Sequence, residues 1–453
     1  MVLAVAGLVS LALVLPLPVH GQTAPAAAAA ASFPADGWWS GFGDAQLDTL
    51  IAEGLKGATD LRVAEARFRS ATAAVGGARA ALLPTIGATA QAGVAKQSYN
   101  YLFPAAFAPK GWKEMGEADL SLNWQIDFWG KNRAALAASK SDAQAAGAEE
   151  AAARLTVATG IAAAYADLAA LYAEHDAAAD AVRVRAATLD LITRRRAEGL
   201  ENEGAVARAR SNLATAQGEL AALDEQIANE GHAIAALLGA RPERAASIAR
   251  PAIAARAALA PADNLPAELI GRRPDIIAAR ARAEAAAARI RVAKAAFYPN
   301  VNLAGLIGFQ SLGLANLFKS GSDYGSAGPA VTLPIFDGGK LRANKRGAEA
   351  DYAAATAQYD GTLVQALREV ADATTSQREL ARRLSAAQEA EEAAHASWQV
   401  ANNRYRGGLA TYLDVLTAED ALVSARRARA QLTTRAFALD IALIRALGGG
   451  YRA

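Results

Sequence analysis

RYRGGLATYLDVLTAEDAL, from Arg404 to Leu422, places a glycine-leucine break between two alanine-rich runs of helical character. A weaker copy, RRAEGLENEGAVARARSNL, begins 209 positions earlier (404 minus 195). Glycine directly after a helical run is a common helix stop. A break at the same place in each half of the chain therefore predicts two equivalent helical hairpins. Four residues mark the breaks: Gly199, Leu200, Gly408 and Leu409.

Both breaks lie in long segments without proline. The first segment predicts helices over 131–198 and 205–238, and the second predicts helices over 340–406 and 412–447. The first of these helices would be about 100 Å long at about 1.5 Å per residue. That length exceeds ordinary globular helices and indicates a coiled coil or a tube of helices.

Alternating sequence precedes each pair of long helices. DLSLNWQID, residues 119–127, alternates apolar and polar side chains without error. Strands are predicted over about 85–97, 117–127, 300–310 and 324–335, with one apolar and one polar face. The apolar face is predicted to face lipid through eight side chains: Leu120, Leu122, Trp124, Ile126, Val301, Leu303, Ile307 and Phe309.

The order of predicted elements occurs twice, as helix, strand, loop, strand, long helix, break and helix. In the first copy, 44–83 is predicted as one helix. The apolar run at the N-terminus predicts a signal peptide, and a membrane anchor is the alternative interpretation. The chain then divides into five parts: the signal peptide 1–21, an N-terminal linker 22–43, a first repeat 44–241, a proline-rich connector 242–274 and a second repeat 275–453.

Composition narrows the function. The net charge of +2 gives no argument for nucleic acid. The chain has no cysteine, so disulfides and thiolate metal sites are excluded, and its four histidines lie far apart. It also lacks a phosphate-binding loop and a nucleophile motif. We therefore expect no enzymatic activity, no cofactor and no bound metal.

Four strands with one apolar face cannot close into a barrel alone. Unpaired strand edges in lipid are costly, so only a closed barrel is viable there, and the smallest have about eight strands. Closure then demands at least two chains, and three would give twelve strands. The alternative is a sheet packed on the helices. Aromatic residues near the strand ends suit a membrane-interface girdle: Trp124, Phe128, Trp129, Phe309 and Tyr324.

The chain resembles the outer-membrane channel proteins of bacterial tripartite efflux and type I secretion systems. The resemblance rests on WWSGFGDAQLDTL near the start, RRPDI (272–276), KAAFYPNV (294–301), GPAVTLPIFDGGK (328–340), ALREVADA (366–373) and RYRGGLATYLDVLTAEDAL (404–422). These motifs follow the family's order and cover nearly the whole chain. The branch most similar to this chain serves resistance-nodulation-division pumps.

The resemblance implies a mainly α-helical fold with a transmembrane β-barrel. Three copies would form a homotrimer, with a twelve-stranded barrel in outer-membrane lipid of a Gram-negative bacterium and a helical tube in the periplasm. The implied partners are a periplasmic adaptor protein and an inner-membrane pump of the resistance-nodulation-division type. The implied function is passive export of drugs or other small toxic molecules. Type I protein secretion and a helical surface protein are the alternatives.

Many members of this branch are lipid-anchored through a cysteine at the mature N-terminus. Because the sequence has no cysteine, we expect no such anchor here.

The resemblance also implies a gate at the second break. Asp414 occupies the family's first aspartate position, and Thr417 occupies the second. Tyr405 matches the tyrosine that helps hold the helices closed. The gate arginine position holds Ala410, so Arg404 is a candidate to replace it, as is its neighbour Arg406.

Three copies of Asp414 around a threefold axis would repel one another and favour cations. The alternative role is local, because Thr411 and Asp414 also match a helix capping box. The first break carries Ala205 where the second carries Asp414. Only one of the two breaks is therefore expected to carry the acidic ring.

Overall fold

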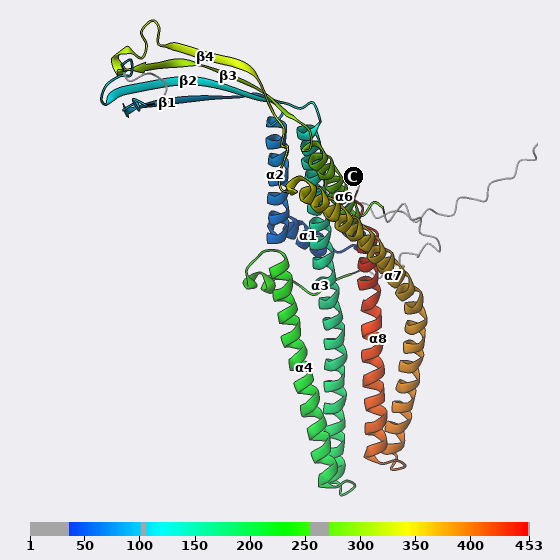
Figure 1. Ribbon diagram of the computed structural model, residues 1–453. Coiled ribbons are helices and arrows are strands. Elements are labelled where there is room, and N and C mark those ends of the chain that lie inside the picture. The colour runs from blue at the N-terminus through cyan, green and yellow to red at the C-terminus, as the bar shows by residue number, and fades with distance from the viewer. Residues whose placement is uncertain (1–35, 101–105, 254–270, 452–453) are drawn as a thin grey trace, which may run out of the picture. The chain divides into compact units, whose positions relative to one another are not determined.

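The computed structural model describes residues 36–100, 106–253 and 271–451 (Figure 1). The described residues belong to one compact unit. The predicted signal peptide over 1–21 lies outside the described residues, as do residues 101–105 of the loop between the first two strands. Residues 22–35 of the predicted linker and residues 254–270 of the predicted connector are also outside them.

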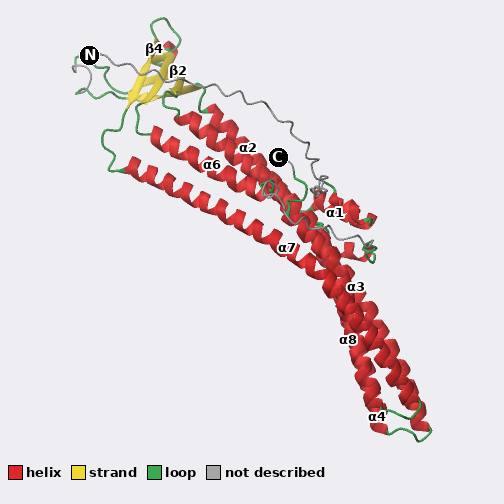
Figure 2. Cartoon of the chain, turned by 90° about the vertical axis from the view of Figure 1, so that its right-hand side faces the viewer, coloured by secondary structure: helices red, strands yellow, loops and turns green. Residues whose placement is uncertain are grey.

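Two long helical hairpins dominate the described chain (Figures 1 and 2). The first consists of α3 (Lys131–Ala197) and α4 (Glu203–Leu237), and the second of α7 (Lys340–Arg406) and α8 (Tyr412–Ala446). α3 and α7 each have 67 residues, and α4 and α8 each have 35. The offset of 209 therefore holds at both ends of every long helix (340 minus 131), which makes the hairpins structurally equivalent.

Helix α3 is the centre of the packing. It contacts α1 (Ala45–Gly57), α2 (Thr59–Ala80), α4, α6 (Pro274–Ala295) and α8. Its buried positions are mostly alanine. Alanine favours the helix and, because its side chain is small, lets neighbouring helices approach closely.

The predicted N-terminal linker is wrong for its last residues. Trp38–Phe42 forms a 3-10 helix, η1, whose Trp38 and Phe42 side chains are buried in the main core. The ring of Phe42 packs edge-to-face on Phe437 of α8, with 4.6 Å between the ring centroids. The segment therefore packs into the core, because burying two large aromatic rings stabilises the fold, whereas an unpacked linker would leave both rings in water.

The predicted single helix over 44–83 is also wrong, because it breaks between α1 and α2. Ala58, at the break, has an extended ψ of 127°. The C-terminal end of α4 packs against this point, where a Cβ on Gly57 would lie 2.4 Å from the carbonyl oxygen of Leu238. A Cβ on Gly239, which has a φ of 70°, would lie 2.3 Å from the carbonyl oxygen of Gly57. A contact between segments remote in sequence therefore sets the break.

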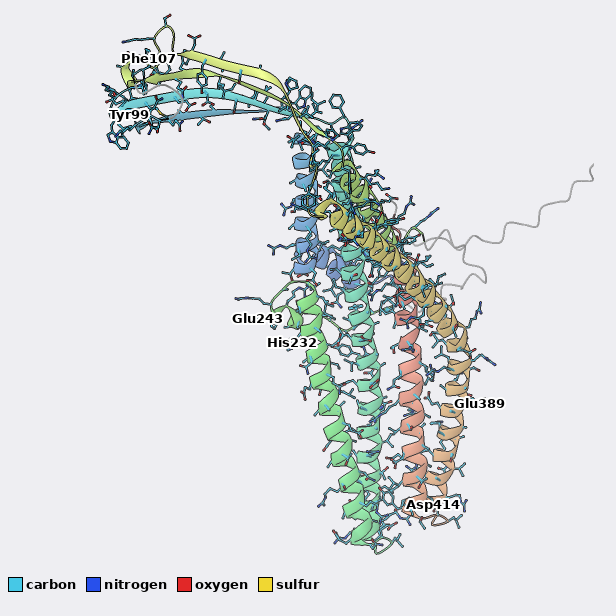
Figure 3. All side chains as sticks on the ribbon, in the orientation of Figure 1. Tyr99, Phe107, His232, Glu243, Glu389 and Asp414 are labelled. Atoms are coloured by element: carbon cyan, nitrogen blue, oxygen red, sulfur yellow. The ribbon has the colours of Figure 1, made fainter. Side chains whose placement is uncertain are left out.

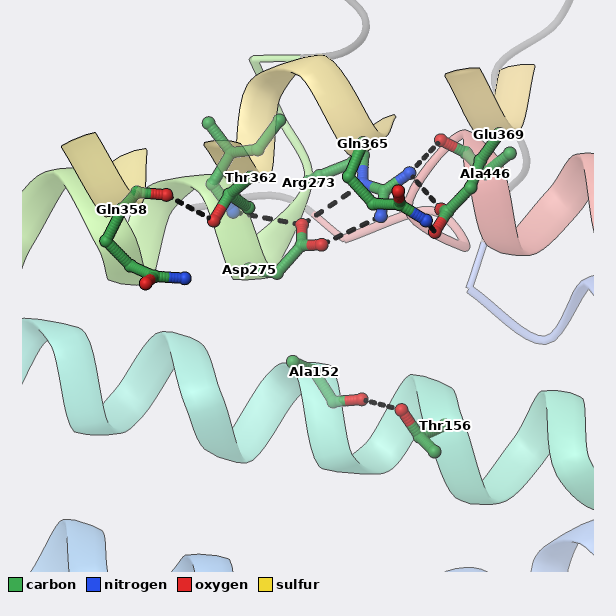
Figure 4. Close-up of polar contacts among 10 residues, drawn as sticks. Ala152, Thr156, Arg273, Asp275, Gln358, Thr362, Gln365, Glu369 and Ala446 are labelled. Carbon is green, nitrogen blue, oxygen red and sulfur yellow. Dashed lines mark hydrogen bonds and ion pairs between the residues drawn. The ribbon is translucent and has the colours of Figure 1, made fainter. Parts of the chain in front are cut away.

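In the second repeat, the end of α8 packs instead against Arg273, which precedes α6 (Figure 4). The buried guanidinium donates bidentately to Asp275 at 3.1 and 2.7 Å. It also donates to Glu369 of α7 at 2.8 Å and to the carbonyl of Ala446 at 3.1 Å. One arginine from the RRPDI motif thus ties α6, α7 and α8 together.

The strands form one antiparallel sheet in the order β1-β2-β3-β4. Two bounds differ from the prediction by more than two residues. β2 begins at Lys113, four positions early, and β4 ends at Thr332, before Pro334, which lacks the N–H that pairing needs. Among the described residues, no α-helix covers either face of the sheet (Figure 2). The alternative of a sheet packed on the helices is therefore wrong. The strand bounds are β1 Thr85–Ala95, β2 Lys113–Ile126, β3 Asn300–Leu312 and β4 Asp323–Thr332.

Candidate functional site: the helical tips and the sheet

The two hairpins end in the same turn chemistry. At the first tip, the N–H of Leu200 donates to the carbonyl of Arg195 at 2.8 Å, and Gly199 has a φ of 77°. At the second tip, the N–H of Leu409 donates to the carbonyl of Arg404 at 2.8 Å, and Gly408 has a φ of 73°. Glycine tolerates this left-handed conformation, so both helices stop at the same point.

The helices that follow the two breaks begin differently. Asn202 caps α4, its side-chain oxygen accepting from the N–H of Ala205 at 2.9 Å. Thr411 caps α8 within a capping box, and its N–H and hydroxyl each lie 2.7 Å from one oxygen of Asp414. Figure 3 shows Asp414 at this turn. The helix capping box of Thr411 and Asp414, which the sequence indicated as the alternative role, is therefore present in the structure.

The side chain of Asp414 is exposed. Hydrogen bonds from the Thr411 hydroxyl and then from the Thr411 backbone lower the pKa of its carboxyl, and the charge of Arg404 adds to the effect. Asp414 is therefore a carboxylate at neutral pH, held in one place and open to solvent within a single chain.

Tyr405 differs from the other gate candidates because it is buried, with 1% of its surface exposed. Its hydroxyl donates to a carboxylate oxygen of Glu201 at 2.7 Å. The guanidinium of Arg195 lies 4.6 Å from its ring centroid and donates to its backbone carbonyl at 3.0 Å. Burial, followed by the hydrogen bond to Glu201, raises the pKa of Tyr405. Tyr405 therefore joins the tips of the two hairpins.

Arg404 and Thr417 make local contacts only. A guanidinium nitrogen of Arg404 lies 3.4 Å from the carbonyl of Leu409 within the turn. The hydroxyl of Thr417 donates to the carbonyl of Leu413 on its own helix at 2.9 Å. Both side chains are exposed. The four gate candidates thus divide into one buried tie between hairpins and three residues on the surface of the tip.

An apolar cluster supports the tip from behind. It combines side chains of α3, α4, α7 and α8, so both hairpins contribute to it. The rings of Tyr405 and Tyr412 lie 6.4 Å apart within it. Its buried members are Ile192, Ala205, Val206, Ala209, Tyr405, Tyr412 and Val415.

Sequence reasoning missed the partners that the first hairpin supplies. Glu201 and Arg195 hold Tyr405. Farther from the tip, buried Glu419 of α8 accepts from the hydroxyl of Thr188 of α3 at 3.1 Å, and Arg185 lies beside it. The repeat match of residues 195–213 with 404–422 indicated where the first tip lies. No local pattern in the sequence marked Glu201, Thr188 or Glu419 as contact residues.

The strand register puts the eight predicted lipid-facing side chains on one face of the sheet. Ile86 of β1 and Val331 of β4 extend this face. Leu120 and Ile307 are 53% and 68% exposed, so no part of the described chain covers them. The direct pairs between β2 and β3 are Leu120 with Ile307, Trp124 with Leu303, Ile126 with Val301, Ala118 with Phe309, and Leu122 with Gly305.

Tyr324 does not belong to the apolar face, contrary to the grouping of aromatic residues made from the sequence. It pairs with Gly308, which pairs with Asp119 on the polar face. Its hydroxyl donates to Glu117 of β2 at 2.6 Å, across the strand that lies between them. Gly308 has no side chain to obstruct this contact. The polar face also includes the apolar side chain of Leu306, so the alternation of apolar and polar side chains is incomplete in β3.

Two further properties bear on function. Among the described residues, only α3 is long and apolar enough to cross a membrane, and half of its most apolar window is buried, as is common at the centre of a helical bundle. In the same residues, no group of three or more acidic, histidine or cysteine side chains could hold a metal ion.

Comparison with known proteins agrees with this architecture. The family model described as "Outer membrane efflux protein" matches residues 50–240 and 265–449. The pyoverdine export outer membrane protein OpmQ of Pseudomonas putida is 30% identical over 440 residues, which span 96% of this chain and 93% of that protein. The fusaric acid resistance protein FusA of Burkholderia cepacia is 34% identical over 326 residues, which span 71% of this chain and 61% of that protein.

The outer membrane protein VceC of Vibrio cholerae, a solved structure, superposes with a TM-score of 0.88 at 45% sequence identity. The superposition covers 92% of this chain and all of that one. The chain belongs to the outer membrane efflux protein family.

Proposed function

We propose that this protein is the outer-membrane exit duct of a tripartite efflux system and works as a homotrimer. As a member of its family, the chain is a channel of the Gram-negative outer membrane with a large periplasmic helical part. Small toxic molecules would enter the duct from an inner-membrane pump and leave the cell without further energy input.

The observation that carries the proposal is a sheet with two open edges and one exposed apolar face. Within the part of the chain that the structure describes, β1 and β4 each pair on one side only. In lipid, the unpaired backbone groups along such edges would cost several kcal/mol each. Neighbouring strands are antiparallel throughout, so β4 of one chain can pair in the same sense with β1 of the next. Three copies would close a twelve-stranded barrel in this way.

The two faces of the sheet support the same arrangement. The exposed apolar face suits lipid, and the polar face, with Glu117, Asp119 and Asn123, suits a water-filled lumen. Exposed apolar residues also stand where strands meet helices, as interfacial girdles do. Trp129 stacks on Tyr298 at 4.7 Å between ring centroids, and Phe128 is exposed beside it.

The helical tips are the proposed gate. Three copies of the second tip would bring Asp414 residues together around the axis, and their repulsion would oppose closure. The tie from Tyr405 to Glu201 and Arg195 would hold each chain in the closed arrangement. A periplasmic adaptor would open the tip by binding the open state more tightly than the closed state.

Membrane fractionation tests this function. We expect the chain in the outer-membrane fraction, migrating as a trimer that heating converts to monomers. Deletion of the gene should increase susceptibility to small toxic compounds, and the compounds affected would identify the substrates. A monomer outside the membrane fraction would contradict the proposal. Loss of an exported protein without any change in susceptibility would favour type I secretion.

A further inference from the structure

Glu419 is a buried carboxylate away from the proposed gate contacts. It lies in α8 and is 2% exposed. One oxygen accepts from the hydroxyl of Thr188 of α3 at 3.1 Å, and the other lies 3.6 Å from Nε of Arg185. Burial raises the pKa of this carboxyl. A buried acid is costly unless it is paired, so these contacts with α3 compensate for its position.

Arg185 connects three helices at the same level. Its guanidinium donates to the carbonyl of Asn212 in α4 at 3.1 Å and to Asp420 in α8 at 3.0 Å. Its side chain is 14% exposed, whereas that of Asp420 is 56% exposed. The first hairpin is therefore joined to the second through one largely buried arginine and one buried glutamate.

The contacts of Arg185 and Glu419 form a joint between the hairpins that is separate from the tip. Arg185 precedes Arg195 by ten positions on α3, which corresponds to about 15 Å along the helix. The joint also occurs in one repeat only. By the offset of 209, Arg210 stands where Glu419 stands, and Ala394 stands where Arg185 stands. The contacts of Tyr405 with Arg195 and of Glu419 with Thr188 and Arg185 both join α3 to the second hairpin.

We infer that Glu419 is a second latch of the gate, which α8 must release from Thr188 and Arg185 before the tip can open. The inference rests on the proposed function, because it assumes that the tip opens by parting the two hairpins of each chain. Tyr405 and Glu419 then hold the closed state at two of the levels at which the hairpins are joined, and breaking the tie of Tyr405 alone leaves the Glu419 level intact.

Glu419→Gln tests the latch, because glutamine keeps the volume and can still accept from Thr188 but loses its charge opposite Arg185. In planar bilayers, we expect the open fraction of the full-length channel to rise on the order of tenfold, the size of effect expected from a charge-assisted contact. Glu203→Gln is the matched control, since Glu203 is exposed near the tip and pairs with Arg196 of its own hairpin. An equal effect in both variants, or none in Glu419→Gln, would overturn the latch.

A cross-link gives a second measurement that does not depend on weakening the fold. The chain has no native cysteine, so Thr188→Cys with Glu419→Cys introduces one specific pair. We expect the oxidised channel to stay closed and the reduced channel to conduct again. Opening of the oxidised, fully cross-linked channel would overturn the latch while leaving the proposed function intact. A wild-type chain that never forms pores would contradict the proposed function and the latch together.

Discussion

The hydroxyl of Tyr405 donates a 2.7 Å hydrogen bond to the carboxylate of Glu201, which lies in the other hairpin. Tyr405 is at the end of α7, and Glu201 is in the turn between α3 and α4. The bond therefore joins the turn of the first long hairpin to the turn of the second. Two segments separated by about 200 residues in the sequence are thus held in one arrangement. Under the proposed gate, the stability of that arrangement would set how readily the tip opens.

Tyr405→Phe should weaken this tie while keeping the ring that packs against Arg195. A hydrogen bond to a charged group contributes about 1.5–3 kcal/mol, and partial exposure of Glu201 reduces the loss to about 1 kcal/mol. We expect a lower melting temperature and a higher open fraction in bilayers. A double-mutant cycle with Glu201→Gln measures the coupling directly. Strictly additive effects of the two substitutions would show that the bond contributes nothing.

Gly239→Ala should destabilise the protein far more than Gly199→Ala. Both glycines have left-handed backbone conformations, with φ of 70° and 77°, so alanine costs about 1–2 kcal/mol at each. A Cβ at Gly239 would in addition lie 2.3 Å from the carbonyl oxygen of Gly57, whereas nothing lies within 4 Å of one at Gly199. Melting temperatures of the two purified variants test the difference. Equal losses would mean that α1 and α4 do not meet as closely as described.

Local signals in the sequence were sufficient for the long helices. Proline-free alanine-rich runs and the glycines at 199 and 408 predict where they begin and end to within about two residues, because helix propensity and left-handed glycine stops act locally. Strict alternation likewise predicted the two faces of the sheet, since side chains in a strand alternate by geometry alone. The fold class is confirmed by the structural relatives.

Contacts between distant segments could not be predicted in the same way. The break after Gly57 depends on the end of α4, far along the chain. The partners of Tyr405 and Glu419 come from the other hairpin, and single glutamates on a charged helix carry no mark of burial. The grouping of Tyr324 with the girdle aromatics did not anticipate that it lies on the polar face of the sheet. Tyr324 is at the beginning of β4, where the alternating run of side chains is too short to show which face it takes.

Low pH should weaken the contacts through which Asp44 holds the N-terminal segment, α3 and the connector together. Asp44 accepts from the hydroxyl of Tyr165 at 2.6 Å and from the N–H groups of Ala252 and Gln46, both at 2.9 Å. Burial alone would raise the pKa of Asp44, but these hydrogen bonds outweigh it, and the pKa is lowered below 3.8. The stabilisation is therefore complete above the unfolded value of 3.8 and is lost as the pH falls through the lower folded value.

Asp44→Asn provides the measurement. The variant should melt at a lower temperature than the wild type at neutral pH, and the gap should narrow as the pH falls below about 4. Narrowing is expected because only the wild type has a carboxylate to protonate at this position. A gap that stays constant over the acid range would mean that Asp44 contributes through shape and not through its charge.

The two roles of Asp414 can be separated by a pair of substitutions. Glutamine at the third position of a helix can still reach back to the capping residue, so Asp414→Gln keeps the capping box and removes the charge. Thr411→Ala removes the capping hydroxyl and keeps the carboxylate. If three copies of Asp414 line the pore, Asp414→Gln should shift the reversal potential in a salt gradient towards that of an unselective channel, with little change in melting temperature. Thr411→Ala should lower the melting temperature and preserve cation preference. If the charge acts only through the cap, both variants would melt early and neither would alter selectivity, because a carboxylate outside the pore does not act on the permeating ions.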